Sequence, residues 1–178
     1  MPDRIKDLSV TVGGLGHIRA ASGTWGSLPP VILWMVLVLY CLAPRSWQMV
    51  VVLLATALLG SLACIAWGKW AEGKYGKKDP GQVVADEVAG QALALLCLQQ
   101  MTLGFGPEWL SVVAPGVFAF LAFRMFDIIK LPPAAGLQAK PHGWGILIDD
   151  LVAGIYANVG TQLGIILLAQ PILDRLFA

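Results

Sequence analysis

Long stretches without charged residues dominate the pattern of hydrophobic and polar positions. Four of them cover positions 20–44, 46–68, 88–107 and 151–173. A fifth, shorter stretch from Trp109 to Phe123 continues through Met125 and Phe126, beyond Arg124. A helix needs about 20 mostly apolar residues to cross a membrane. The pattern therefore predicts an all-α, polytopic membrane bundle of about five spans.

The first of these spans is expected to be short. Pro29 and Pro30 are typical of the first turn of a helix. This places the helix at about Pro29 to Ala43, short enough to be tilted or re-entrant. The second span is expected from Trp47 to about Trp67, with an aromatic residue at each interface.

Composition excludes the other broad classes. The chain is 57% hydrophobic and 13% charged, with a mean hydropathy of +0.73, whereas soluble domains carry roughly 25% charged residues. A formal net charge of +1 provides no basic field for nucleic acid. We therefore predict one integral-membrane domain over residues 1–178, with membrane lipids around it and no protein partner that the sequence identifies.

Basic residues collect on one side of the five-span arrangement. Ten of the twelve lysines and arginines fall in the N-terminal segment and in the segments 69–87 and 124–150. If successive spans cross the membrane in opposite directions, these three segments lie on the same side of it. Loops rich in Lys and Arg stay in the cytoplasm, so this side is expected to be cytoplasmic.

Acidic residues collect on the same side. Two acid pairs open two spans, and an acid lies between two cations at the end of another; these residues are Asp86, Glu87, Asp149, Asp150, Arg124, Asp127 and Lys130. Acids at helix starts also complement the helix dipole, and the Arg124–Asp127–Lys130 spacing also fits a salt-bridged helix end. Dipole effects do not account for adjacent acid pairs at two spans of such a charge-poor chain.

The two acid pairs share a pattern that ends in glycine. Gly90 and Gly154 each lie a few residues after an acid pair, where a missing side chain allows two helices to approach closely. Converging carboxylates repel unless a cation bridges them, and oxygen ligands without thiolates favour a hard ion, Mg²⁺ first. With Arg124 and Lys130 to bind anions, the set describes a phosphate-handling site. Thr24 and Ser27, expected just before the first span, are candidates to bind phosphate or glycerol oxygens.

At these residues the chain resembles the phosphatidylglycerophosphatase A family of bacterial membrane phosphatases. The shared motifs are Gly23-Thr24 with Gly26-Ser27-Leu28, Asp86-Glu87 with Gly90, Phe123-Arg124 with Asp127 and Lys130, and Ile148-Asp149-Asp150 with Gly154. They cover roughly residues 13 to 157. Ser22 stands where the family usually has proline, which bears on loop shape more than on the reaction.

The resemblance implies Mg²⁺-dependent hydrolysis of phosphatidylglycerophosphate to phosphatidylglycerol and phosphate, at the cytoplasmic face of the bacterial inner membrane. Asp86, Glu87, Asp149 and Asp150 are then expected to include the metal ligands. Asp127 is a further ligand, the general base or a nucleophile. Arg124 and Lys130 would hold the phosphate.

Two other functions remain open from the residues. A CDP-alcohol phosphotransferase also uses Mg²⁺ and acids near a membrane face, but its characteristic pattern of paired acids on consecutive turns is absent. A transporter would be expected to carry ionisable residues near the centres of its spans, and none occurs there.

Overall fold

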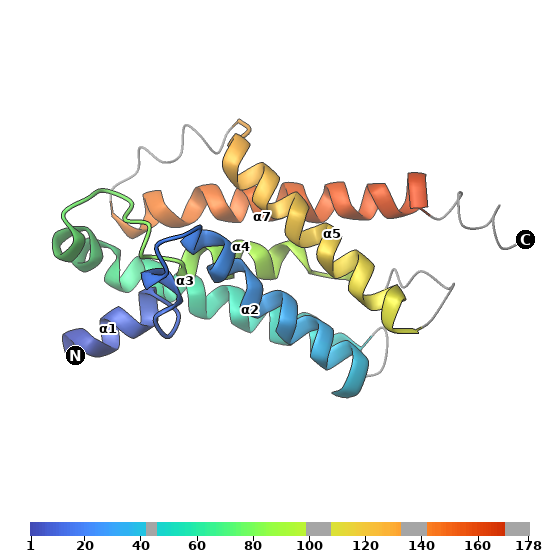
Figure 1. The fold of residues 1–178 in the computed structure, drawn as a ribbon, viewed down its shortest axis with the longest axis horizontal. Coiled ribbons are helices and arrows are strands. Elements are labelled where there is room, and N and C mark those ends of the chain that lie inside the picture. Colours follow the sequence, from blue (N-terminus) through green and yellow to red (C-terminus); the bar gives the residue numbers. More distant parts are fainter. Residues whose placement is uncertain (42–45, 99–107, 133–141, 170–178) are drawn as a thin grey trace, which may run out of the picture.

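The structure is a computed structural model, and it describes residues 1–41, 46–98, 108–132 and 142–169. All regular elements in these ranges are helical (Figure 1). The α-helices are α1 (Asp3–Val10), α2 (Ser22–Val36), α3 (Trp47–Tyr75), α4 (Ala85–Ala94), α5 (Glu108–Ile129) and α7 (Gly143–Gly164). A short 3-10 turn (Leu15–His17) and two π-helical ends (Leu37–Cys41 and Ile165–Ala169) complete the described elements.

Four helices are long and apolar enough to cross a membrane. They span Ser22–Cys41, Trp47–Tyr75, Trp109–Ile129 and Gly143–Leu167. The remaining predicted span, the charge-free stretch at 88–107, corresponds to α4, which has only ten residues and is about 15 Å long. The rest of that predicted span, from position 99 onward, lies outside the described residues. The all-helical membrane bundle is thus confirmed, with α4 as a short central helix.

The first span differs from the prediction at its start. Helix α2 begins at Ser22, and Pro29 and Pro30 lie inside it rather than in its first turn. Together with its π-helical end the span has 20 residues, so it is not a short helix. The segment before Pro29 is helical because Gly26 packs directly on Val84, beside α4, and local propensity did not indicate that contact.

Helix α4 lies at the centre of the bundle, between the longer helices (Figure 1). Eight of its ten residues are buried. At its far end, the Asn158 side chain on α7 donates hydrogen bonds to the carbonyls of Ala94 (3.1 Å) and Leu96 (2.7 Å). Gln162 donates in turn to Asn158 (2.7 Å). A helix that ends inside a membrane protein needs such partners for its last carbonyls.

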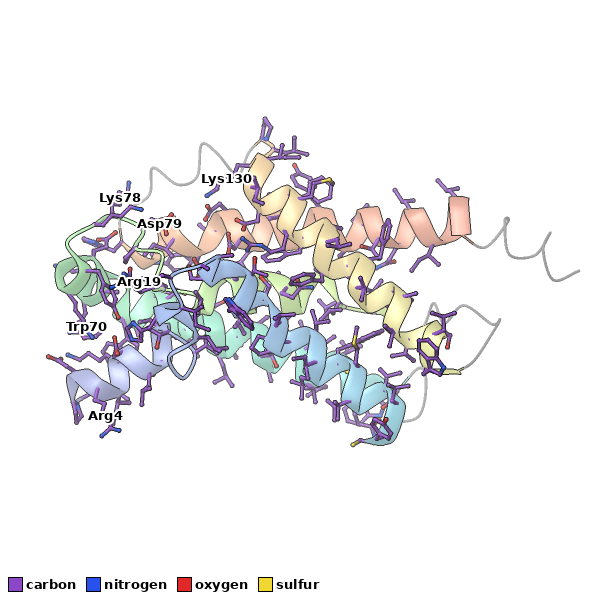
Figure 2. The ribbon with its side chains drawn as sticks, viewed as in Figure 1. Arg4, Arg19, Trp70, Lys78, Asp79 and Lys130 are labelled. Carbon is purple, nitrogen blue, oxygen red and sulfur yellow. The ribbon has the colours of Figure 1, made fainter. Side chains whose placement is uncertain are left out.

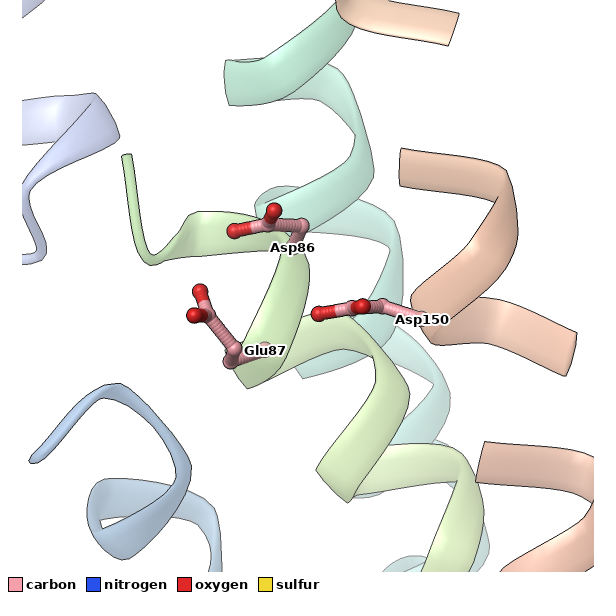
Figure 3. A group of neighbouring side chains, drawn as sticks. All are labelled: Asp86, Glu87 and Asp150. Atoms are coloured by element: carbon pink, nitrogen blue, oxygen red, sulfur yellow. The ribbon is translucent and has the colours of Figure 1, made fainter. Parts of the chain in front are cut away.

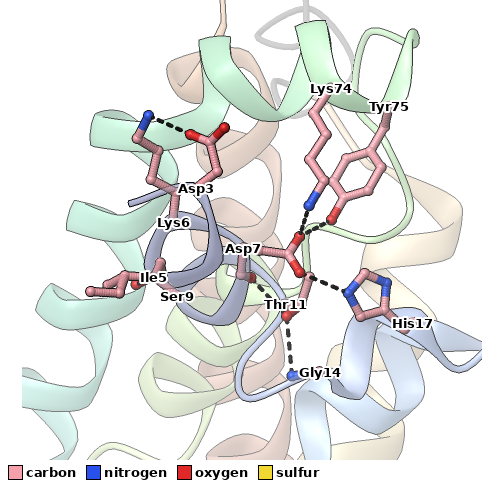
Figure 4. A network of polar contacts seen from close by, with 10 residues as sticks. All are labelled: Asp3, Ile5, Lys6, Asp7, Ser9, Thr11, Gly14, His17, Lys74 and Tyr75. Atoms are coloured by element: carbon pink, nitrogen blue, oxygen red, sulfur yellow. Dashed lines mark hydrogen bonds and ion pairs between the residues drawn. The ribbon is translucent and has the colours of Figure 1, made fainter. Parts of the chain in front are cut away.

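The N-terminal helix α1 is tied to the end of α3 through the carboxylate of Asp7 (Figure 4). Lys74 donates to Asp7 at 2.5 Å, Tyr75 donates to the same oxygen, and the His17 ring bonds the other oxygen at 3.1 Å. Burial raises the pKa of Asp7, but these three bonds outweigh it and lower the pKa to about 2. The network holds the N-terminal segment against the start of α4, where the Val84 amide donates to the Val10 carbonyl.

Charged residues gather at this end of the bundle. Figure 2 shows Arg4, Arg19, Lys78 and Asp79 at the end where α1 lies, with Lys130 in the same half of the bundle. The starts of α2, α4 and α7 lie at the same end, because Gly23 abuts Glu87 and Lys130 pairs with Asp149. The helix ends that carry the predicted site residues therefore converge.

Candidate active site

Three carboxylates form the centre of the site. Asp86 and Glu87 come from the first turn of α4, and Asp150 comes from the second turn of α7. One oxygen from each lies within 4.8 Å of the other two, and the side chains turn toward a common space (Figure 3). Asp86 and Asp150 are buried, with 5% and 4% of their surface exposed. We call these three residues the acid cluster.

Two glycines bring the helices of the acid cluster together. A Cβ atom on Gly154 would lie 2.3 Å from the carbonyl oxygen of Gly90, and one on Gly90 would lie 2.5 Å from that of Asp150. No side chain fits between α4 and α7 at this crossing. The predicted close approach is confirmed. The later pair, Gly160 and Gly164, instead faces the rings of Phe126 and Phe118 at ordinary distances.

The two cations of α5 take part in separate ion pairs. Arg124 contacts Asp127 through Nη1, at 2.8 Å, one turn along the same helix. Lys130 reaches across to α7 and bonds Asp149 at 2.6 Å. Burial by itself would lower the pKa of Lys130, but the hydrogen bond and charge of Asp149 outweigh it and raise the pKa. Lys130 therefore stays protonated and able to bind an anion.

Helix α2 closes the site on another side. Gly23 is buried in its first turn, and a Cβ atom there would lie 2.4 Å from Glu87 Oε1 and 2.9 Å from Arg124 Nη1. Thr24, in the same turn, is partly exposed. Ser27 is fully buried and its hydroxyl donates to the Gly23 carbonyl at 2.7 Å. With its proton used in this bond, Ser27 offers a ligand only an acceptor.

The donor set fits a hard divalent cation. Asp86 Oδ1 and Glu87 Oε2 are buried and have no hydrogen-bond partner among the described residues. Among the described residues, the five predicted carboxylates are accompanied by two predicted cations, Arg124 and Lys130. Negative charge is therefore in excess in this set, and burying unpaired charge is costly. All the available donors are oxygens, as Mg²⁺ requires. Of the five predicted ligands, the structure groups Asp86, Glu87 and Asp150, while Asp127 and Asp149 make the ion pairs described above.

One contact and one residue near the site were not predicted. Gly23 belongs to a predicted motif, but its contact with Glu87 depends on how α2 packs. Asp79, in the loop after α3, interacts electrostatically with Asp149 and Lys130 and is drawn near Lys130 in Figure 2. No motif contains Asp79, so only the folding of that loop identifies it.

Comparison with known proteins finds a matching family and several relatives. The family model described as phosphatidylglycerophosphatase A matches residues 8–165. Proteins named phosphatidylglycerophosphatase A from Haemophilus influenzae and Escherichia coli are 36% and 30% identical, over 82% and 80% of this chain and 80% and 73% of their own lengths. A Bacteroides thetaiotaomicron protein with phosphatidylinositol-3-phosphatase in its name is 33% identical over 85% of this chain and 90% of its own.

No solved structure matches this chain. The family match spans all four predicted motifs and every residue of the acid cluster. On this evidence the chain belongs to the phosphatidylglycerophosphatase A family of membrane phosphatases.

Proposed function

We propose that this protein hydrolyses phosphatidylglycerophosphate to phosphatidylglycerol and inorganic phosphate, with Mg²⁺ as its cofactor. The acid cluster is the observation that carries the proposal, because three converging carboxylates next to Arg124 and Lys130 suit a metal-assisted phosphate site. The family match and the names of two relatives support the substrate.

The residues divide into three roles. Asp86, Glu87 and Asp150 hold the cation, which when bound polarises the phosphoryl oxygens. Arg124 and Lys130 bind those oxygens and offset the negative charge that builds up during transfer. Asp127, oriented by its ion pair with Arg124, accepts the proton of the attacking water. Thr24 in the first turn of α2 contacts the substrate headgroup, and Asp149 positions Lys130.

The site faces the cytoplasm in this proposal. Figure 2 shows Arg4, Lys78 and Lys130 in the half of the bundle where α1 lies, and Lys130 pairs with Asp149, next to Asp150 of the acid cluster. Such basic residues remain on the cytoplasmic side of a membrane. The named relatives are bacterial, so the membrane is the bacterial inner membrane.

Phosphate release from phosphatidylglycerophosphate by the purified protein in mixed micelles tests the function. We expect release with Mg²⁺, none with EDTA, and recovery when Mg²⁺ is restored. Phosphatidylinositol 3-phosphate is the second substrate, because one relative carries that activity in its name. Faster release from the inositol lipid would contradict the proposed substrate, and release without a metal ion would contradict the proposed cofactor. A CDP-alcohol phosphotransferase would need a cytidine nucleotide and release no phosphate.

A further inference from the structure

Gln91 is a buried polar side chain without partners. It lies on α4 with 0% of its surface exposed, and neither Nε2 nor Oε1 has a hydrogen-bond partner among the described residues. Asn158, the other amide near α4, has both of its groups bonded. A carboxamide shut away from water without partners is unfavourable for folding. Each such group in a native protein needs an explanation, and an ordered water or another ligand provides one.

Gln91 lies directly beneath the acid cluster. It follows Glu87 by four residues, so the two side chains leave the same face of α4. Residues of the facing helix α2 and of α4 indicate where Gln91 lies between the acid cluster and the apolar interior. Gly23 abuts Glu87, and one turn below Gln91 the side chains of Val31 and Leu95 belong to one buried apolar cluster. Gln91 therefore lies on α4 between the acid cluster and the apolar cluster, and we place it at the floor of the site.

The chemistry of the amide indicates which ligand fits. Nε2 is a donor and Oε1 is an acceptor, and neither makes a hydrogen bond within the described ranges. An oxygen of a phosphate dianion can only accept hydrogen bonds, so it would bond to Nε2 and leave Oε1 without a donor. A water molecule both donates and accepts and satisfies both. Ser27, on the facing helix, has already donated its proton to Gly23 and does not compete as a donor.

We propose that Gln91 holds the water molecule that attacks phosphorus, an inference that rests on the proposed function. The lipid enters by its terminal phosphate and its glycerol trails outward, so a water at the floor lies opposite the leaving group, as in-line displacement requires. The water oxygen forms a bond to phosphorus, and the bond from phosphorus to the glycerol oxygen breaks with its electron pair on that oxygen. Asp127 takes the proton of the water, and the glycerol oxygen takes a proton from solvent.

The test replaces the amide by an apolar side chain of similar length, Gln91→Met. Because no bond of the described protein is lost, we expect this variant to be at least as stable as the wild type, with Tm raised by about 2–4 °C in detergent. We expect kcat to fall about a hundredfold and KM to change less than about threefold, because the phosphate contacts remain.

Thr161→Val is the matched control. Thr161, on α7, is also fully buried, and its hydroxyl has no hydrogen-bond partner in the part of the chain that the structure describes, but it lies three turns from Asp150. This variant should gain stability and keep kcat. A Gln91→Met enzyme with kcat within about twofold of wild type, or with a lowered Tm, would overturn the inference, as would a phosphoenzyme trapped during turnover. If the wild type itself releases no phosphate, the proposed function fails instead.

Discussion

The crossing of α4 and α7 at Gly90 and Gly154 offers a direct test of how the fold sets the geometry of the site. In a Gly154→Ala variant, the new methyl group would lie 2.3 Å from the Gly90 carbonyl oxygen and 2.9 Å from its carbonyl carbon. Both atoms belong to the backbone, so no side-chain rotation relieves the contact. The helices must separate instead.

The required separation can be estimated from the contact itself. Ordinary contacts begin at 3.4 Å, so α4 and α7 must move apart by about 1 Å. Asp150 lies one helical turn before Gly154, so it moves with the crossing. The oxygens of the acid cluster lie within 4.8 Å of one another, and two oxygens on one Mg²⁺ are at most about 4.2 Å apart. A further 1 Å puts Asp150 beyond reach of a cation held by Asp86 and Glu87.

We therefore expect Gly154→Ala to raise the Mg²⁺ concentration for half-maximal activity at least about tenfold and to lower kcat about a hundredfold. Overpacking costs about 1–3 kcal/mol and alanine gains roughly 1 kcal/mol of helix propensity over glycine, so we expect the variant to fold with a free energy of unfolding lowered by at most about 2 kcal/mol. Phosphate release against Mg²⁺ concentration, with Tm measured on the same preparation, separates the two effects.

Gly160→Ala on the same helix is the control. A Cβ atom there meets the Phe126 ring at 3.5 Å, an ordinary contact, so this variant should keep full activity and gain stability. The reasoning is refuted if Gly154→Ala keeps more than about a third of the wild-type kcat with an unchanged Mg²⁺ requirement.

Three further predictions follow from other contacts. Asp127→Asn should nearly abolish phosphate release while expression and membrane insertion stay normal, since the amide can still contact Arg124 but takes no proton; near-normal turnover would contradict this role. Asn158→Ala should lower the free energy of unfolding by about 1–3 kcal/mol, measured by denaturation in detergent, because two carbonyls of the α4 end lose their donor; an unchanged value would mean that the α4 end finds other partners. The pKa of Asp7 is lowered to about 2 from 3.8, so its contribution to the stability of the folded protein is present above pH about 4 and is lost as the pH falls toward 2. Hydrogen exchange in α1 should therefore rise between about pH 4 and pH 2 in the wild type. An Asp7→Asn variant should show no such rise.

The fold class was predictable because a membrane imposes strong constraints on composition. Charge-free stretches long enough to span a bilayer are visible without any tertiary information, and the four long helices lie where those stretches predict them. The central helix was harder to predict. The sequence of α4 reads as part of a full span, and its end near Ala94 depends on Asn158 from a helix more than sixty positions away.

The candidate site, like the fold, was predictable from the sequence only in part. The sequence by itself determined its chemistry, because acid pairs, an Arg–Asp–Lys series and adjacent glycines are unusual in so charge-poor a chain. Tertiary structure decided which of these residues meet. The three carboxylates of the acid cluster come together, and Lys130 pairs with Asp149. Gly23 contacts Glu87, and Gln91 is buried one turn beyond Glu87 on α4. These pairings depend on how closely α2, α4 and α7 approach, and that distance is set by backbone contacts at glycines, which the sequence marks only as missing side chains.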